Sequence, residues 1–246
     1  MEITLDRKEM KREAREAMRA AKPWAGWVTL AAIAIIAVLE LLSVKLEFPG
    51  KTLREIALAY WDETEFENLL IAGVAGQSFI SRALSFAVSV MNAVVIAGYT
   101  GYTMNVARSA PAGFGDLFDA FEILLKVLVL NILENLFIAL WSLLLIIPGI
   151  IAAYRYSMAI YILLDDPDKS VMDCIRESKA MTMGHKGELF VLDLSFLGWV
   201  LLSVIPFVAL YAVPYMMVTR ANYYRNISGR YSAPWVDSGA PDQPGY

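Results

Sequence analysis

Five charged side chains lie within or beside long apolar stretches of this chain, and they are its strongest candidates for chemistry. They are Glu40, Arg82, Glu134, Arg155 and Asp193. A charge in the middle of a lipid bilayer costs about 2.5–3.5 kcal/mol on insertion scales, so such a group is by default a functional candidate. Carboxylates that face an aqueous cavity could relay protons or small ions. The alternative, which we prefer, is structural: charges pair between helices, and arginines extend toward the interface.

Depth along the helices predicts which of these charges can meet. Glu134 lies about a dozen residues before the Pro148-Gly149 pair, roughly 20 Å at the helical rise of 1.5 Å per residue. Arg155 follows that pair closely, so we do not expect it to pair with Glu134. The predicted outer group is Arg155, Glu40 and Arg82. The predicted inner group is Glu134 and Asp193, with Asn131 and Asn135 nearby.

A second candidate set lies at the end of a predicted surface helix. It consists of Lys179, His185 and Lys186. Cationic side chains at the membrane edge can bind a lipid phosphate. The preferred alternative is an ordinary solvated helix end.

The sequence lacks motifs for enzymatic or metal chemistry. Cys174 is the only cysteine and His185 the only histidine, so we expect neither an internal disulfide nor a zinc cluster. The acidic run 165–168 lacks the spacing and the closing glutamate of an EF-hand. Walker A, zinc-protease and GxSxG motifs are also missing. We therefore expect no metal, no cofactor and no enzymatic activity.

The hydrophobic pattern places these residues in a membrane protein. Hydrophobic residues make up 58% of the 246-residue chain, whereas soluble domains contain about 45–50%. The mean hydropathy is +0.51. The run from Leu136 to Leu164 is interrupted only by Pro148-Gly149 and Arg155. Because this run is too long for one soluble core helix, it predicts two apolar helices that fold back at the Pro-Gly pair.

We predict an all-α fold, an integral membrane bundle of about six transmembrane helices with additional amphipathic surface helices. About 20 apolar residues cross a bilayer. The membrane domain is predicted over 24–226, with spans at 24–44, 80–107, 123–147, 150–164, 189–205 and 207–218. The second span is rich in small residues and should be central, because small faces let helices approach closely. Pro206 is either a turn between the last two spans or a kink.

The N-terminal segment 1–23 is predicted to form a cytoplasmic basic amphipathic helix. Its seven cations could hold it against an anionic leaflet, or the helix could be solvated and only set orientation. Nucleic acid is not an expected partner. At the other end of the chain, the Ser-, Gly- and Pro-containing tail 227–246 is predicted to be disordered.

Two further surface helices are indicated by capping signals. Thr52 and Glu55 could cap a short helix in the acidic connection 45–78. Ser170 and Asp173 predict the start of an amphipathic helix, and Gly184 a stop beyond it.

The distribution of positive charge predicts the orientation. With a cytoplasmic N-terminus and six spans, 16 of the 21 Lys and Arg residues fall in inside segments and three in outside segments. Membrane proteins carry their excess of Lys and Arg on the cytoplasmic side. We therefore predict a multi-pass protein of the cytoplasmic membrane with both termini in the cytoplasm.

The second half of the chain resembles a known family. The relevant text is LWSLLLIIPGIIAAYRYSMAIYILLDDPDKSVMDCIRESKAMTMGHKGELFVLDLSFLGW at 140–199, followed by VPYMMVTRANYY at 213–224. GYTGYTMNVAR at 98–108 and GDLFDAF at 115–121 fit more loosely. This text is similar to the domain-of-unknown-function 975 family of polytopic bacterial membrane proteins. The resemblance implies a multi-span α-helical protein of the cytoplasmic membrane with no established activity.

These observations favour a non-enzymatic scaffold or accessory component that organises lipids or partner proteins. The expected partners are the lipid bilayer, anionic lipids, and a membrane-protein partner or a second copy of the chain. The alternative is a small-solute or ion transporter or channel that uses the intramembrane charges. A lipid-acting enzyme is the weakest hypothesis.

Overall fold

The fold is entirely helical in the part of the chain that the structure describes. The computed structural model describes residues 7–48, 51–59, 62, 64, 67, 68, 71 and 78–229. Within these residues there are helices and connecting turns but no strand, so the predicted all-α fold class is confirmed. Most of the predicted tail, 230–246, lies outside the described residues.

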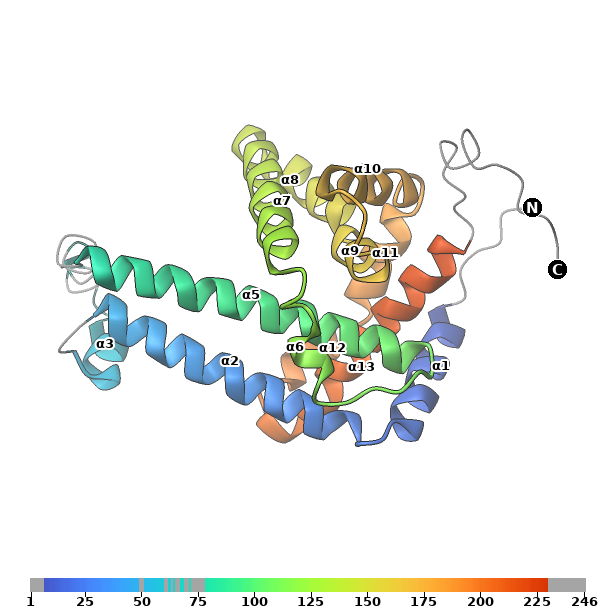
Figure 1. Cartoon of the computed structure of the whole chain (residues 1–246), viewed down its shortest axis with the longest axis horizontal. Helices are drawn as coiled ribbons and strands as arrows, with labels where there is room; N and C mark the ends of the chain where they lie inside the picture. Colours follow the sequence, from blue (N-terminus) through green and yellow to red (C-terminus); the bar gives the residue numbers. More distant parts are fainter. Residues whose placement is uncertain are drawn as a thin grey trace.

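The longest helices form an extended pair. Helix α2 (Ala25–Glu47) and helix α5 (Phe79–Ala107) lie side by side and project to the left in Figure 1. The short helix α3 (Leu53–Ala59) lies near their outer end. Its predicted cap is present: the Glu55 N–H donates to Thr52 Oγ1 at 3.2 Å, and the Thr52 N–H donates to Glu55 Oε2 at 2.8 Å.

A second apolar hairpin contains helix α7 (Leu124–Leu144) and helix α8 (Ile146–Tyr156). The turn lies at Leu145, whose backbone is extended, and not at the predicted Pro148-Gly149 pair. Pro148 instead occupies the first turn of α8, where a helix has no intrahelical partner for its N–H groups and tolerates proline. The Pro-Gly pair therefore marks the first turn of α8, which begins directly after the turn at Leu145.

Gly149 has a packing role in this hairpin. A Cβ atom at this position would collide with the Ser142 side chain on α7. The missing side chain lets α7 and α8 approach closely next to the turn, as small residues do in membrane helix pairs.

The predicted fourth span is discontinuous. Helix α8 ends at Tyr156, and helix α9 (Ala159–Asp165) continues after a two-residue turn. Helix α10 (Val171–Met181) packs against this join. From α10, the Ser178 hydroxyl donates to the Arg155 carbonyl at 2.9 Å and accepts from the Met158 N–H at 3.2 Å. A neighbouring helix therefore supplies hydrogen bonds to backbone groups that the break leaves without an intrahelical partner.

Helix α10 begins and ends as its sequence predicts. Ser170 caps it by accepting from the Asp173 N–H at 3.2 Å, and Gly184 adopts a positive φ of 88° beyond its end. The apolar stripe is turned inward, with Cys174, Ile175 and Met181 buried.

The last third of the chain forms α11 (Lys186–Leu194), α12 (Leu197–Leu202) and α13 (Pro206–Ser228). A tight turn separates α11 from α12, and a second turn precedes α13. Pro206 is the first residue of α13 and therefore marks a turn and not a kink.

The basic helix α1 (Arg7–Ala20) packs against α13 and α5. Its apolar face is turned into the protein, where Met10, Ala14 and Met18 are buried. The cations on the other faces therefore project from a docked helix. The short helix α6 (Asp116–Asp119) packs on α5, where Gly98 leaves room for its backbone.

Four helical segments are long and apolar enough to cross a membrane. They are Ala25–Glu47, Phe79–Ala107, Leu124–Leu144 and Ile146–Asp165. Much of their apolar surface is exposed, as expected for helices in lipid. The total of six spans and the orientation remain predictions.

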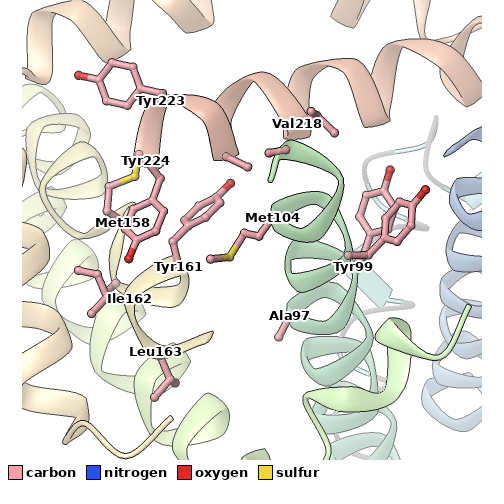
Figure 2. Packing of buried hydrophobic residues seen from close by; sticks show 14 of the residues in the cluster. Ala97, Tyr99, Met104, Met158, Tyr161, Ile162, Leu163, Val218, Tyr223 and Tyr224 are labelled. Carbon is pink, nitrogen blue, oxygen red and sulfur yellow. The ribbon is translucent and has the colours of Figure 1, made fainter. Parts of the chain in front are cut away.

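The core lies where α5, α9 and α13 meet. Figure 2 shows Met104 of α5 pointing toward Tyr161 of α9, with Tyr224 of α13 beside Tyr161 and Tyr223 of α13 above them. The Tyr161 and Tyr224 rings stack with centroids 5.4 Å apart. Both apolar hairpins diverge from this centre (Figure 1).

Candidate functional site

The predicted outer group of charges is not assembled in the structure. The Glu40 carboxylate on α2 accepts from Asn92 Nδ2 of α5 at 2.5 Å. Arg82 is exposed near the beginning of α5. Arg155 lies instead on α8, whose main neighbours are α7, α10 and α11. Its guanidinium lies over the Trp141 ring, 5.7 Å from the centroid.

The predicted inner pair is also separated. Asp193 on α11 forms an ion pair with Arg220 of α13 at 3.4 Å, and it interacts with the Tyr154 hydroxyl. Glu134 on α7 has one carboxylate oxygen that is buried without a hydrogen-bond partner. Depth along the helices therefore did not identify the partners, because α7, which carries Glu134, and α11, which carries Asp193, are not main neighbours of each other.

The predicted headgroup residues are only partly available. His185 Nδ1 lies 3.0 Å from Glu188 Oε2, and the Tyr223 hydroxyl donates to the His185 carbonyl at 3.2 Å. These contacts tie His185 to the beginning of α11. Lys179 is exposed and Lys186 half-buried.

A cluster that the sequence did not reveal joins α1, α5, α9 and α13. We call it the polar junction, and it consists of Glu13, Arg108, Asp165, Tyr224 and Arg225. Arg108 and Asp165 form an ion pair at 2.6 Å, and the Tyr224 hydroxyl donates to the same carboxylate at 3.0 Å. Arg225 donates to the Ala107 carbonyl at 2.6 Å and to Glu13 at 3.0 Å.

Further contacts extend this network in both directions. Lys11 on α1 donates to Ser195 Oγ at 2.7 Å, and its ammonium lies 4.3 Å from the Phe196 ring centroid. Burial lowers the pKa of Lys11, and the charges of neighbouring arginines lower it further. On α7, Lys126 donates to the Pro167 and Lys169 carbonyls. The charge distribution predicts four cytoplasmic segments, at 7–22, 108–122, 165–187 and from 220 onward. Side-chain contacts of the polar junction join all four of them.

An acidic cavity of about 210 Å³ adjoins the polar junction between α5, α6 and α9. Its lining includes Asp116, Asp119 and Glu122 as well as Arg108. Burial raises the pKa of Asp119, and the neighbouring Asp116 and Glu122 carboxylates raise it further. Asp116 accepts from Asn105 Nδ2 at 3.3 Å and the Gly113 N–H at 3.2 Å. No group of His, Cys, Asp and Glu able to hold a metal ion occurs among the described residues.

Comparison with known proteins identifies a family but no function. Residues 142–231 match the family described as "Protein of unknown function (DUF975)". The predicted resemblance to the domain-of-unknown-function 975 family is thereby confirmed. The match begins at the end of α7 and covers α8 to α13, so it includes three of the five residues of the polar junction, namely Asp165, Tyr224 and Arg225. No curated protein and no solved structure matches the chain.

Proposed function

We propose that this membrane protein, which matches the DUF975 family over residues 142–231, is a non-enzymatic scaffold or accessory component that organises partner proteins and lipids. The observation that carries the proposal is the polar junction, which ties chain-distant segments into one charged surface. Ion pairs such as Arg108–Asp165 and Arg225–Glu13 connect α1, α5, α9 and α13. A rigid charged surface beside apolar helices suits the binding of a partner at the membrane interface.

Helix α1 supplies the exposed charge of this surface. Its apolar face is occupied by the protein itself, so the exposed cations remain available for a partner or an anionic leaflet. Among these exposed cations are Arg7, Arg15 and Arg19. Arg15 and Arg19 form no ion pair within the described part of the chain, which makes them the best positions to test.

The proposed topology agrees with this surface. We propose a six-span protein of the cytoplasmic membrane with cytoplasmic termini and the polar junction on the cytoplasmic side. Cysteine-accessibility mapping in intact cells tests it, with labels placed at Arg19 and at Arg54. Labelling of Arg19→Cys from outside the cell would contradict the orientation.

The experiment compares two matched pairs of substitutions in protein purified from its native membranes. One variant carries Arg15→Gln and Arg19→Gln on α1. The control carries Lys51→Gln and Arg54→Gln at the opposite end of the α2–α5 pair. Quantitative mass spectrometry then measures bound proteins and anionic lipids. We expect loss of a stoichiometric partner or lipid in the α1 variant only; equal retention in both variants would contradict the proposal.

Transport is the second candidate function. The buried, unpartnered oxygen of Glu134 favours it, because an intramembrane carboxylate without a partner could bind a cation. None of the three cavities found near α1, α6 and α8 is lined by Glu134 or Asp193. An ion-flux assay in proteoliposomes tests this alternative. Flux that depends on Glu134, and that Glu134→Gln abolishes, would favour transport over scaffolding.

A further inference from the structure

One cavity in the α7–α8 hairpin is apolar on all sides except for a single arginine. It has a volume of about 150 Å³. Its lining residues are Trp141, Pro148, Ile151, Ala152 and Arg155. The volume corresponds to about five water molecules, enough for a carboxylate or phosphate group and the first carbons of a chain.

Arg155 has no anionic partner within the described part of the chain. Its Nε is buried without a hydrogen-bond acceptor, and its side chain forms no ion pair. Arg220, whose Nε is also buried without a partner, differs in having an ion pair with Asp193. The backbone carbonyl of Arg155 accepts from the hydroxyls of Ser178 and Thr182.

An unpaired guanidinium in an apolar membrane segment is unfavourable. The Trp141 ring offers a cation–π contact. A ring face does not replace the oxygen acceptors to which the guanidinium N–H groups donate in the guanidinium plane. The planar donor fork of arginine matches the oxygens of a carboxylate or a phosphate. Arg155 also lies in the last turn of α8, so the helix dipole stabilises its charge there.

The position in the hairpin suits a lipid headgroup. Arg155 lies in the last turn of α8, beside the amphipathic surface helix α10, whose Ser178 hydroxyl donates to the Arg155 carbonyl. Long arginine side chains extend toward the interface, where headgroups lie. The surface around the cavity is apolar and exposed. Ile151 lines the cavity, and the exposed Ile147 and Ile150 are next to lining residues in the chain.

We propose that the Arg155–Trp141 cavity binds the carboxylate or phosphate of an anionic lipid, with its acyl chain along the apolar surface of the α7–α8 hairpin. This site shares no residue with the polar junction or with the exposed face of α1. It can therefore be present or absent whatever the outcome for the scaffold function.

The test measures quenching of Trp141 fluorescence by lipids brominated in the acyl chain. Full-length protein is placed in phosphatidylcholine nanodiscs that contain brominated phosphatidylglycerol, brominated stearate or brominated phosphatidylcholine at equal mole fractions. Subtracting the signal change of Trp141→Phe isolates the contribution of Trp141. The two anionic probes distinguish a phosphate from a carboxylate as the preferred group.

We expect one anionic probe to quench Trp141 at an about fivefold lower mole fraction than the phosphatidylcholine probe, since one cationic contact contributes about that factor. Arg155→Gln should abolish the difference, and Arg82→Gln, an equal loss of charge elsewhere, should retain it. Equal quenching by all three probes in the unmodified protein would overturn the proposal without any variant. Persistence of the preference in a folded Arg155→Gln protein would overturn it as well.

Discussion

Replacing Ser178 with alanine should destabilise the join between α8 and α9 by more than the loss of one hydroxyl suggests. The hydroxyl serves two backbone groups: it donates to the Arg155 carbonyl at 2.9 Å and accepts from the Met158 N–H at 3.2 Å. Ser178 and Met158 are both fully buried, so water cannot easily replace the lost contacts.

The magnitude follows from these two contacts. A buried N–H without an acceptor costs about 1–3 kcal/mol, and a lost hydrogen bond costs about 1 kcal/mol. The second term is reduced because the Thr182 hydroxyl still donates to the Arg155 carbonyl at 3.3 Å. We therefore expect Ser178→Ala to lower the free energy of unfolding by about 2–3 kcal/mol.

The assay is denaturant-induced unfolding in mixed micelles, followed by circular dichroism. The matched control is Ser203→Ala, because the Ser203 hydroxyl donates only to the Trp199 carbonyl of its own helix, at 2.7 Å. We expect the control to change the free energy of unfolding by about 0.5 kcal/mol or less. If both variants have the same stability, the hydroxyl does not hold the helix break together and the reasoning is refuted.

Three further predictions concern single side chains. Gly98→Ala should lower stability by about 1–3 kcal/mol because its Cβ would collide with the α6 backbone. Gly101→Ala is the control, because a Cβ there would meet open space and should not lower stability. Thermal unfolding of both variants measures the difference. Burial raises the pKa of the Cys174 thiol to about 11, so Cys174 should react with a maleimide at pH 7 far more slowly than a cysteine at the exposed position Met183; comparable rates would mean that α10 is not packed as described. The raised pKa of Asp119 means that folded-state stability is lost as pH rises from the unfolded pKa through the folded one. Asp119→Asn should remove that loss in unfolding titrations that start at the ordinary aspartate pKa and proceed upward, and an unchanged pH dependence would argue against it.

The sequence predicted local features of the fold well, because these depend on neighbouring residues. Ser170 and Asp173 begin α10 as expected, and Thr52 and Glu55 cap α3. The all-α class followed from the long apolar runs, because about 20 consecutive apolar residues are typical of a membrane helix. The turn at Leu145 was a local error: a Pro-Gly pair is compatible with a turn and equally with the first turn of a helix.

The candidate sites were predicted less well. The sequence identified Arg155, Glu134 and Asp193 as unusual charges, but it grouped them by depth. In the structure Asp193 pairs with Arg220, and Arg155 faces Trp141. Pairing depends on the rotation of each helix about its axis and on which helices are neighbours, and neither is encoded by distance along the chain.

The sequence by itself determined that this chain is a helical membrane protein and where many of its helices begin and end. It also determined which polar segments carry most of the Lys and Arg residues. Only the tertiary structure decided which of those groups meet. It brought Glu13 to Arg225 and Arg108 to Asp165, although each pair is far apart in the chain. It also left Arg155 without an ion-pair partner among the described residues. The physical reason is that apolar periodicity and caps act over a few residues, whereas ion pairs and cavities arise from side-chain packing between distant helices.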